Sequence, residues 1–139
     1  MLGEMIGEFS GKITGARVLE VEGTAPKVEV SFQGAGTLLA QAMTDLGTYW
    51  QTIRPAGSLY GEGRVVMMTA EGEAAVWTGF GVGTPAGPVP AARYAVAGSF
   101  VTASQQLARL NSITTAIEYN VDEDWNYSYK IWDWQASSG

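Results

Sequence analysis

The chain has 139 residues, with neither cysteine nor histidine, and its 14 acidic and 8 basic residues give a formal net charge of −6. This length suits a single domain with a sizeable core. The missing residue types exclude a Ser-His-Asp triad, a thiol nucleophile and imidazole- or thiolate-bound metals, and the acidic balance with scattered basic residues argues against a nucleic-acid partner.

Alternating apolar and polar residues predict eight β-strands. In chain order they cover approximately residues 7–21, 27–33, 37–54, 58–69, 74–82, 93–101, 114–121 and 126–134. The third segment also has helical propensity, so a helix is the alternative there, and we expect its strand to break near residues 45–47. Residues 84–92 are a proline-rich loop, and residues 102–111 predict a short helical turn.

Short connections between successive strands predict an antiparallel up-and-down meander, which loses its free edges when it closes into a barrel. We therefore expect an all-β fold, a single eight-stranded antiparallel barrel over residues 1–134 with one short helical turn, and a flexible tail at 135–139. A β-sandwich is the alternative. No apolar stretch reaches about 20 residues, and the N-terminus carries glutamates where a signal peptide carries basic residues, so we expect a cytoplasmic protein without a membrane partner.

Glycine is unusually frequent, with 18 of 139 residues, and it alternates with other residues inside two neighbouring predicted strands. Gly61 and Gly63 lie in one strand, and Gly79, Gly81 and Gly83 lie in the next. Because side chains alternate between the two faces of a strand, each set leaves one face bare. A bare face that points inward makes room for a ligand, whereas one that points outward receives another element. The sequence leaves both orientations open.

Four segments carry a resemblance to a known group: GEMIGEFSGKITGARVLEV, LYGEGRVVM, TGFGVG and YNVDEDWNYSYKIWDW. They resemble uncharacterised bacterial proteins with a calycin-like barrel, a group structurally related to the allene oxide cyclase barrel. The resemblance extends from about residue 3 to residue 134. It implies an eight-stranded antiparallel barrel with a central apolar cavity, often oligomeric, and among wider relatives it implies cofactor-free cyclases. It assigns no catalytic residue to this chain.

Catalysis without histidine or cysteine would depend on carboxylates, tyrosines, basic side chains or shape. Glu62 and Arg64 share the strand face opposite the glycines, so an outward bare face would bring them inside as an acid/base and its partner. Tyr49 and Tyr94 have hydroxyls that can hydrogen-bond an oxygenated ligand. Our candidate catalytic residues are therefore Glu62, Tyr94 and Tyr49. The structural alternatives are a solvent-exposed Glu62–Arg64 pair and tyrosines that only pack in the core.

A cavity in such a barrel needs walls and a polar anchor. The candidate ligand-binding residues are Arg64, Met43, Met67, Met68, Phe80, Phe100 and Arg54. Asp45 shares a strand face with Tyr49 and Gln51, and an interior Asp45 or Glu62 without a cationic partner would favour catalysis. The last strand has bulky residues on both faces, which predicts either a homo-oligomer or packing against the chain's own N-terminus.

These features favour a protein that binds a small hydrophobic or amphipathic molecule inside the barrel. A cofactor-free cyclase or isomerase is the second hypothesis, and a structural barrel filled by its own side chains is the third. We expect no cofactor and no metal. The glycine pairs lack phosphate-loop spacing, and the acidic run at residues 122–124 lacks the spacing of an EF-hand.

Overall fold

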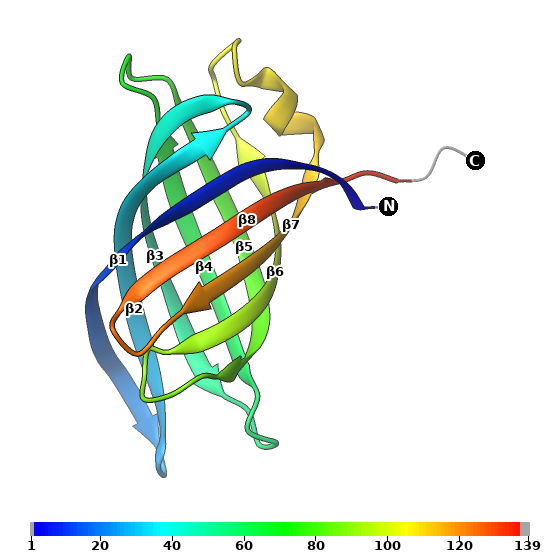
Figure 1. Cartoon of the computed structure of the whole chain (residues 1–139). Helices are drawn as coiled ribbons and strands as arrows, with labels where there is room; N and C mark the ends of the chain where they lie inside the picture. The colour runs from blue at the N-terminus through cyan, green and yellow to red at the C-terminus, as the bar shows by residue number, and fades with distance from the viewer. Residues whose placement is uncertain (1, 137–139) are drawn as a thin grey trace.

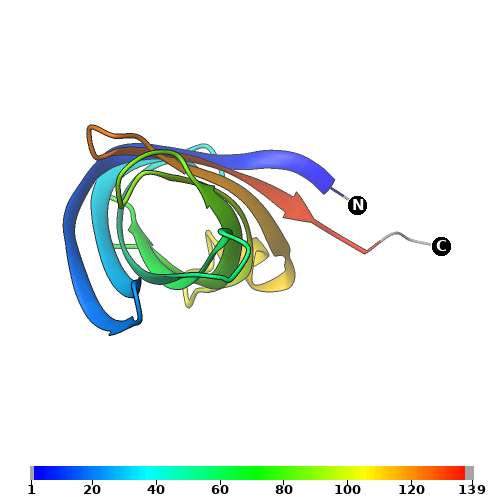
Figure 2. The ribbon, with the colours of Figure 1, turned by 90° about the horizontal axis from the view of Figure 1, so that it is seen from below.

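The computed structural model describes residues 2–136 and shows a closed barrel in which eight antiparallel strands follow one another in sequence order (Figure 1). The strands are β1 (Leu2–Glu22), β2 (Ala25–Leu38), β3 (Gln41–Ile53), β4 (Leu59–Met68), β5 (Ala74–Pro85), β6 (Ala92–Val101), β7 (Thr114–Val121) and β8 (Asn126–Trp134). From below, the strands form a ring (Figure 2). The predicted all-β barrel is confirmed. No helix within residues 2–136 has the length and apolar character needed to cross a bilayer.

The structure also decides the local alternatives. β3 is one unbroken strand, so the helix alternative and the expected break at residues 45–47 are both wrong. The predicted helical turn is shorter than expected, because the 3₁₀ turn η1 runs only from Ala108 to Ser112. Of the tail expected to be flexible, residues 135 and 136 have no regular structure, and residues 137–139 lie outside the described residues.

β1 is long because the segments that pair with its two neighbours are offset along the strand. Its residues from Leu2 to Lys12 pair with β8 and close the barrel, while those from Gly7 to Glu22 pair with β2. Two register shifts in the pairing with β2 add bends to the strand. The part of β1 beyond Lys12 has no partner in β8, so the β1–β2 hairpin projects past the barrel (Figure 1).

The alternating glycines face the barrel interior. On β4 they share a face with Leu59, Val65 and Met67, all of which are buried. Gly63, Gly79 and Gly98 are cross-strand neighbours on β4, β5 and β6, so they form a continuous bare strip of inner wall. The bare glycine face therefore points inward, which is one of the two orientations that the sequence left open.

Aromatic rings of the protein's own core cover much of this bare backbone. A Cβ atom added at Gly79 would lie 2.5 Å from the indole ring of Trp77, and one added at Gly98 would meet the same ring. Phe32 lies over Gly47 in the same way, and the ring of Tyr94 lies against Gly81 and Gly83. The glycines therefore give large inward side chains the space that an eight-stranded barrel otherwise lacks.

We predict that Gly79→Ala destabilises the fold because the new methyl group overlaps the Trp77 ring and the main chain of Ala97. Overpacking of this kind lowers the free energy of unfolding by about 1–3 kcal/mol, which urea denaturation will measure. Gly15→Ala is the matched control, since nothing lies within 4 Å of a Cβ at that position. Equal stabilities for the two variants would contradict the packing argument.

Candidate functional site

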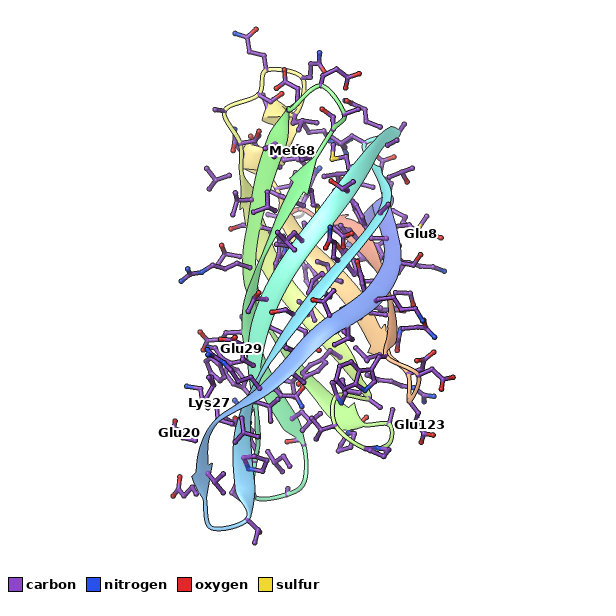
Figure 3. All side chains as sticks on the ribbon, turned by 90° about the vertical axis from the view of Figure 1, so that its left-hand side faces the viewer. Glu8, Glu20, Lys27, Glu29, Met68 and Glu123 are labelled. Carbon is purple, nitrogen blue, oxygen red and sulfur yellow. The ribbon has the colours of Figure 1, made fainter. Side chains whose placement is uncertain are left out.

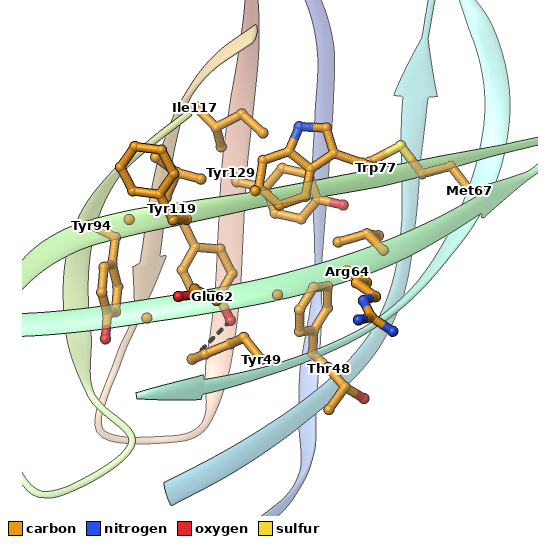
Figure 4. A pocket seen from close by; sticks show the side chains of 18 residues that line it. Thr48, Tyr49, Glu62, Arg64, Met67, Trp77, Tyr94, Ile117, Tyr119 and Tyr129 are labelled. Carbon is orange, nitrogen blue, oxygen red and sulfur yellow. Dashed lines mark hydrogen bonds between the residues drawn. The ribbon is translucent and has the colours of Figure 1, made fainter. Parts of the chain in front are cut away.

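The barrel contains an apolar cavity of about 70 Å³ (Figure 4). Gly61, Gly63, Gly79 and Gly81 form the bare side of its wall. Large side chains from other strands complete the lining, among them Phe32, Tyr49, Met67, Trp77, Tyr94, Val96, Ile117, Tyr119 and Tyr129. A cavity of roughly 150 Å³ is known to admit benzene. In the conformation described, this cavity therefore has room for only a few non-hydrogen atoms.

Five of the six tyrosines contribute rings to the interior, and several of their hydroxyls are paired with one another or with polar neighbours. The Tyr119 hydroxyl donates to the Tyr49 hydroxyl over 3.2 Å (Figure 4). The Tyr94 hydroxyl donates to Oε1 of Gln51 over 2.9 Å. Burial raises the pKa of Tyr49, Tyr94 and Tyr119 above the ordinary value of 10.0. At neutral pH these groups are protonated hydrogen-bond donors and not bases.

Trp77 is fixed by a second interior network. Its indole N–H donates to the hydroxyl of Thr115 over 2.9 Å, and that hydroxyl donates to the main-chain carbonyl of Gly98, also over 2.9 Å. The ring therefore stays against the glycine strip of β5 and β6, where it forms one boundary of the cavity. The size of the cavity depends directly on this anchored ring.

A buried carboxylate lies next to the cavity. Asp45 on β3 is 1% exposed, and its Oδ2 accepts hydrogen bonds from the hydroxyls of Tyr127 at 2.8 Å and Tyr129 at 2.7 Å. Its other oxygen, Oδ1, is buried and has no hydrogen-bond partner among the described residues. Burial raises the pKa of Asp45 above 3.8, while the tyrosine hydrogen bonds act in the opposite direction.

No basic side chain balances this charge inside the barrel. None of the eight basic residues is buried, and Asp45 forms no ion pair within residues 2–136. The basic residues are Lys12, Arg17, Lys27, Arg54, Arg64, Arg93, Arg109 and Lys130. The interior therefore combines aromatic rings, hydroxyl donors and one carboxylate that lacks a counter-ion.

The other buried carboxylate, Asp133, is paired through Oδ2, while its Oδ1 has no hydrogen-bond partner among the described residues. The Arg109 guanidinium donates to Asp133 Oδ2 over 3.0 Å and to Glu4 over 2.7 Å. Because Arg109 belongs to η1, these contacts hold η1 to β1 and β8. Leu107 and Leu110 beside it are fully buried, so this segment packs onto the core.

The structure places Glu62 and Arg64 on the outer face, contrary to the arrangement that would have made Glu62 an interior acid. Both side chains are exposed, since the glycine face of β4 is the inner one. The two residues border the cavity where the strand passes between its glycines, with their side chains directed away. Glu62 accepts a 2.7 Å hydrogen bond from the hydroxyl of Tyr60 on this outer surface.

Two expected lining residues also lie outside. Met68, labelled in Figure 3, is 41% exposed. Phe80 is 50% exposed, and like Met68 it occupies the strand face opposite the buried residues and glycines. Arg54 is exposed too, and its guanidinium lies 4.4 Å from the centre of the Tyr60 ring. The side chains of Met68 and Arg54 are therefore not part of the interior lining, while Phe80 borders the cavity although its side chain is half exposed.

The remaining candidates are inside. Tyr49, Tyr94 and Met67 line the cavity, and Met43 and Phe100 are buried in the surrounding core. The sequence analysis did not identify the pairing of Asp45 with Tyr127 and Tyr129. The strand alternation did place Asp45 on the same face as Tyr49, which was the available signal. Its tyrosine partners lie more than 80 positions away in the chain.

A wider depression of about 580 Å³ lies on the outer surface across β2, β1, β8 and β7. Its residues include Glu8, Ser10, Glu118 and Lys130, all of them exposed. Lys130 is the cross-strand neighbour of both glutamates, so its charge is balanced. Within residues 2–136 no group of three carboxylates is close enough to hold a metal ion.

The fold and the interior define a closed eight-stranded antiparallel β-barrel with an aromatic core and a small apolar cavity. No protein-family model and no curated protein sequence match the chain. Several solved structures do match its fold. A protein of unknown function from Clostridium acetobutylicum has a TM-score of 0.80 and 13% identity, with 95% of this chain and 98% of that chain covered.

Two further structures extend the comparison. A β-barrel-like protein from Acinetobacter baumannii has a TM-score of 0.77 and 14% identity, covering 96% of this chain and 94% of that chain. An enzyme from Penicillium herquei has a TM-score of 0.64 and 17% identity, covering 95% of this chain and 96% of that chain. At these identities the likeness shows the barrel fold and says nothing about activity.

We predict a specific pH dependence of stability from Asp45. The unfolded chain releases this proton near 3.8, whereas the folded protein holds it to a higher pH. The folded state therefore binds more protons between these values, so the free energy of unfolding should fall as pH rises through this window. Asp45→Asn removes the ionisation and should flatten this part of the curve, by about 1.4 kcal/mol for each unit of pKa elevation.

Urea denaturation between pH 3.5 and pH 8 measures this difference. Tyr129→Phe provides a second check, because it removes a hydrogen bond that favours the ionised carboxylate and should shift the window to higher pH. Parallel curves for the wild type and Asp45→Asn would show that Asp45 titrates as it does in the unfolded chain.

Proposed function

We propose that this barrel binds a small, mostly apolar molecule in its interior. The observation that supports the proposal is the cavity between the glycine strip and the aromatic rings, with hydroxyl groups at its border. Bare backbone on one side and apolar rings on the other form the kind of surface that holds small ligands through shape, with few polar contacts. Tyr49 accepts from Tyr119 and keeps its own hydroxyl proton to donate to an oxygen of an amphipathic ligand, whereas Tyr94 would have to give up its hydrogen bond to Gln51 to do the same.

The volume limits the size of this molecule. A ligand larger than a few atoms must displace core side chains, and Met67 is the most adaptable of those that line the cavity. Trp77 is held by the hydrogen bond to Thr115 and is a poor candidate for movement. The proposal therefore favours a short chain or a single small ring over a large polycyclic molecule.

A cofactor-free cyclase or isomerase is the second candidate. Protonated Tyr49 and Tyr94 could polarise a carbonyl or stabilise an oxyanion in a cavity that excludes water. The fold relation to the Penicillium herquei enzyme and the resemblance to the allene oxide cyclase group are compatible with this reading. Glu62 has no place in it, since its side chain is exposed, but the buried Asp45 without a cationic partner is the feature that would favour catalysis. A barrel filled by its own side chains is the remaining alternative.

Native mass spectrometry of the purified protein, followed by solvent extraction, tests the binding function. We expect a bound small molecule in the wild type and at least a tenfold lower occupancy in Val96→Leu, which adds volume to the cavity lining. Val82→Leu is the control, because Val82 lies on the outer face of β5 and is 42% exposed. The same spectra give the oligomeric state, for which we propose a homo-oligomer.

An empty protein that also fails to take up butan-1-ol at millimolar concentration would contradict the proposal and favour the filled barrel. Equal occupancy in Val96→Leu and the wild type would place the bound molecule elsewhere on the protein.

A further inference from the structure

Asp45, Asp133 and Ser104 each have a buried side-chain oxygen without a hydrogen-bond partner among the described residues, but of the two aspartates it is Asp45 that also lacks a cationic partner. Gln51 and Thr115 both accept hydrogen bonds from interior side chains, and Asp133 Oδ2 is paired with Arg109. Asp45 Oδ2 accepts two hydrogen bonds, but Oδ1 accepts none from the described residues and is shielded from solvent. A buried carboxylate oxygen without a donor is costly, so this position calls for a donor from outside the chain.

The carboxylate adjoins the proposed binding cavity through two shared side chains. Tyr129 lines the cavity and also donates to Asp45. Met67 lines the cavity and is the direct cross-strand neighbour of Asp45 on β4. Met67 is unbranched and completely buried, so a change of its rotamer is a way to connect the cavity with Asp45 that leaves the backbone in place.

The surroundings of Asp45 suit a cation. Its two hydrogen-bond partners are stacked tyrosines, with ring centres 5.9 Å apart, and Phe32 lies 4.7 Å from the ring centre of Tyr127. Tyr127 and Tyr129 meet Asp45 through their hydroxyl groups, so the attraction for an ammonium group comes from the charge of the carboxylate, and the rings supply apolar surroundings. The chain provides no basic side chain of its own for this role, since none of its lysines or arginines is buried.

We propose that Asp45 is the polar anchor of the interior site and that the ligand is a small primary amine. The ammonium group donates to Asp45 Oδ1, and the apolar part of the ligand lies in the cavity against the glycine strip. This inference rests on the proposed binding function and adds to it the chemical class of the ligand. The competing occupant of Oδ1 is a water molecule, which needs no binding function at all.

Three probes of equal chain length distinguish these cases: n-butylamine, butan-1-ol and butyrate. The indole N–H resonance of Trp77 in a ¹⁵N-labelled protein reports occupancy, because this group lines the cavity and its hydrogen bond to Thr115 is internal. Trp77→Phe identifies the resonance among those of the five tryptophans. At neutral pH we expect saturable shifts with butylamine, at least tenfold weaker binding of butanol, and no binding of butyrate.

Variants then test the role of Asp45. Asp45→Asn should weaken butylamine binding at least tenfold while changing butanol binding less than threefold. Met67→Ala should strengthen butylamine binding, because it opens the cavity towards the carboxylate. Asp133→Asn is the matched control, since it changes the other buried aspartate, which does not line the cavity and is paired with Arg109. It should leave the preference for the amine unchanged.

The outcomes separate the two proposals. If butanol and butylamine bind equally, or if Asp45→Asn binds the amine as the wild type does, the amine assignment is wrong and the binding function stands. If no probe binds to the wild type or to Met67→Ala, and no molecule co-purifies, both proposals are wrong and a water molecule is the occupant of Oδ1. The comparison of the three probes on the wild type remains decisive even if Asp45→Asn fails to fold.

Discussion

The contact between inward aromatic rings and bare glycine backbone determines the interior of this barrel. Eight strands enclose a space that ordinary side chains nearly fill. Glycine in place of inward side chains on β4, β5 and β6 lets Trp77 and Tyr94 approach the wall at positions where a Cβ atom would overlap their rings. The small cavity is what remains between these rings and the parts of the glycine strip that they leave uncovered.

The same packing explains the unusual chemistry of the interior. Tyrosine rings supply the volume that the glycines release, and each ring brings a hydroxyl that must be paired in a dry environment. The chain meets this demand with pairs such as Tyr119 with Tyr49 and Tyr94 with Gln51. Asp45 accepts hydrogen bonds from the hydroxyls of both Tyr127 and Tyr129. Its carboxylate is thereby held in the core, away from water, and this burial raises its pKa.

Much of the architecture could be predicted from the sequence because it depends on local patterns. The period of two located every strand, and short connections indicated antiparallel neighbours that close into a barrel. The direction of the glycine face was harder, since alternation defines two faces without saying which is inside. With the structure in hand, the charged residues of β4 explain why its glycine face is the inner one. Glu62 and Arg64 share the non-glycine face of β4, and two charges belong in solvent unless the core contains partners for them.

The site itself depends on contacts that no local pattern contains. Asp45 lies on β3 and its partners lie on β8, with β2 and β1 between them along the wall, so the pairing of β1 with β8 that closes the barrel brings them together. A single aspartate on a strand face shared with Met43 and Tyr49 indicates a buried acid, but it does not reveal which donors reach it. The oxygen that remains without a donor is a property of the closed barrel. The interior is therefore closely packed, yet Oδ1 of Asp45 still lacks a hydrogen-bond donor among the described residues.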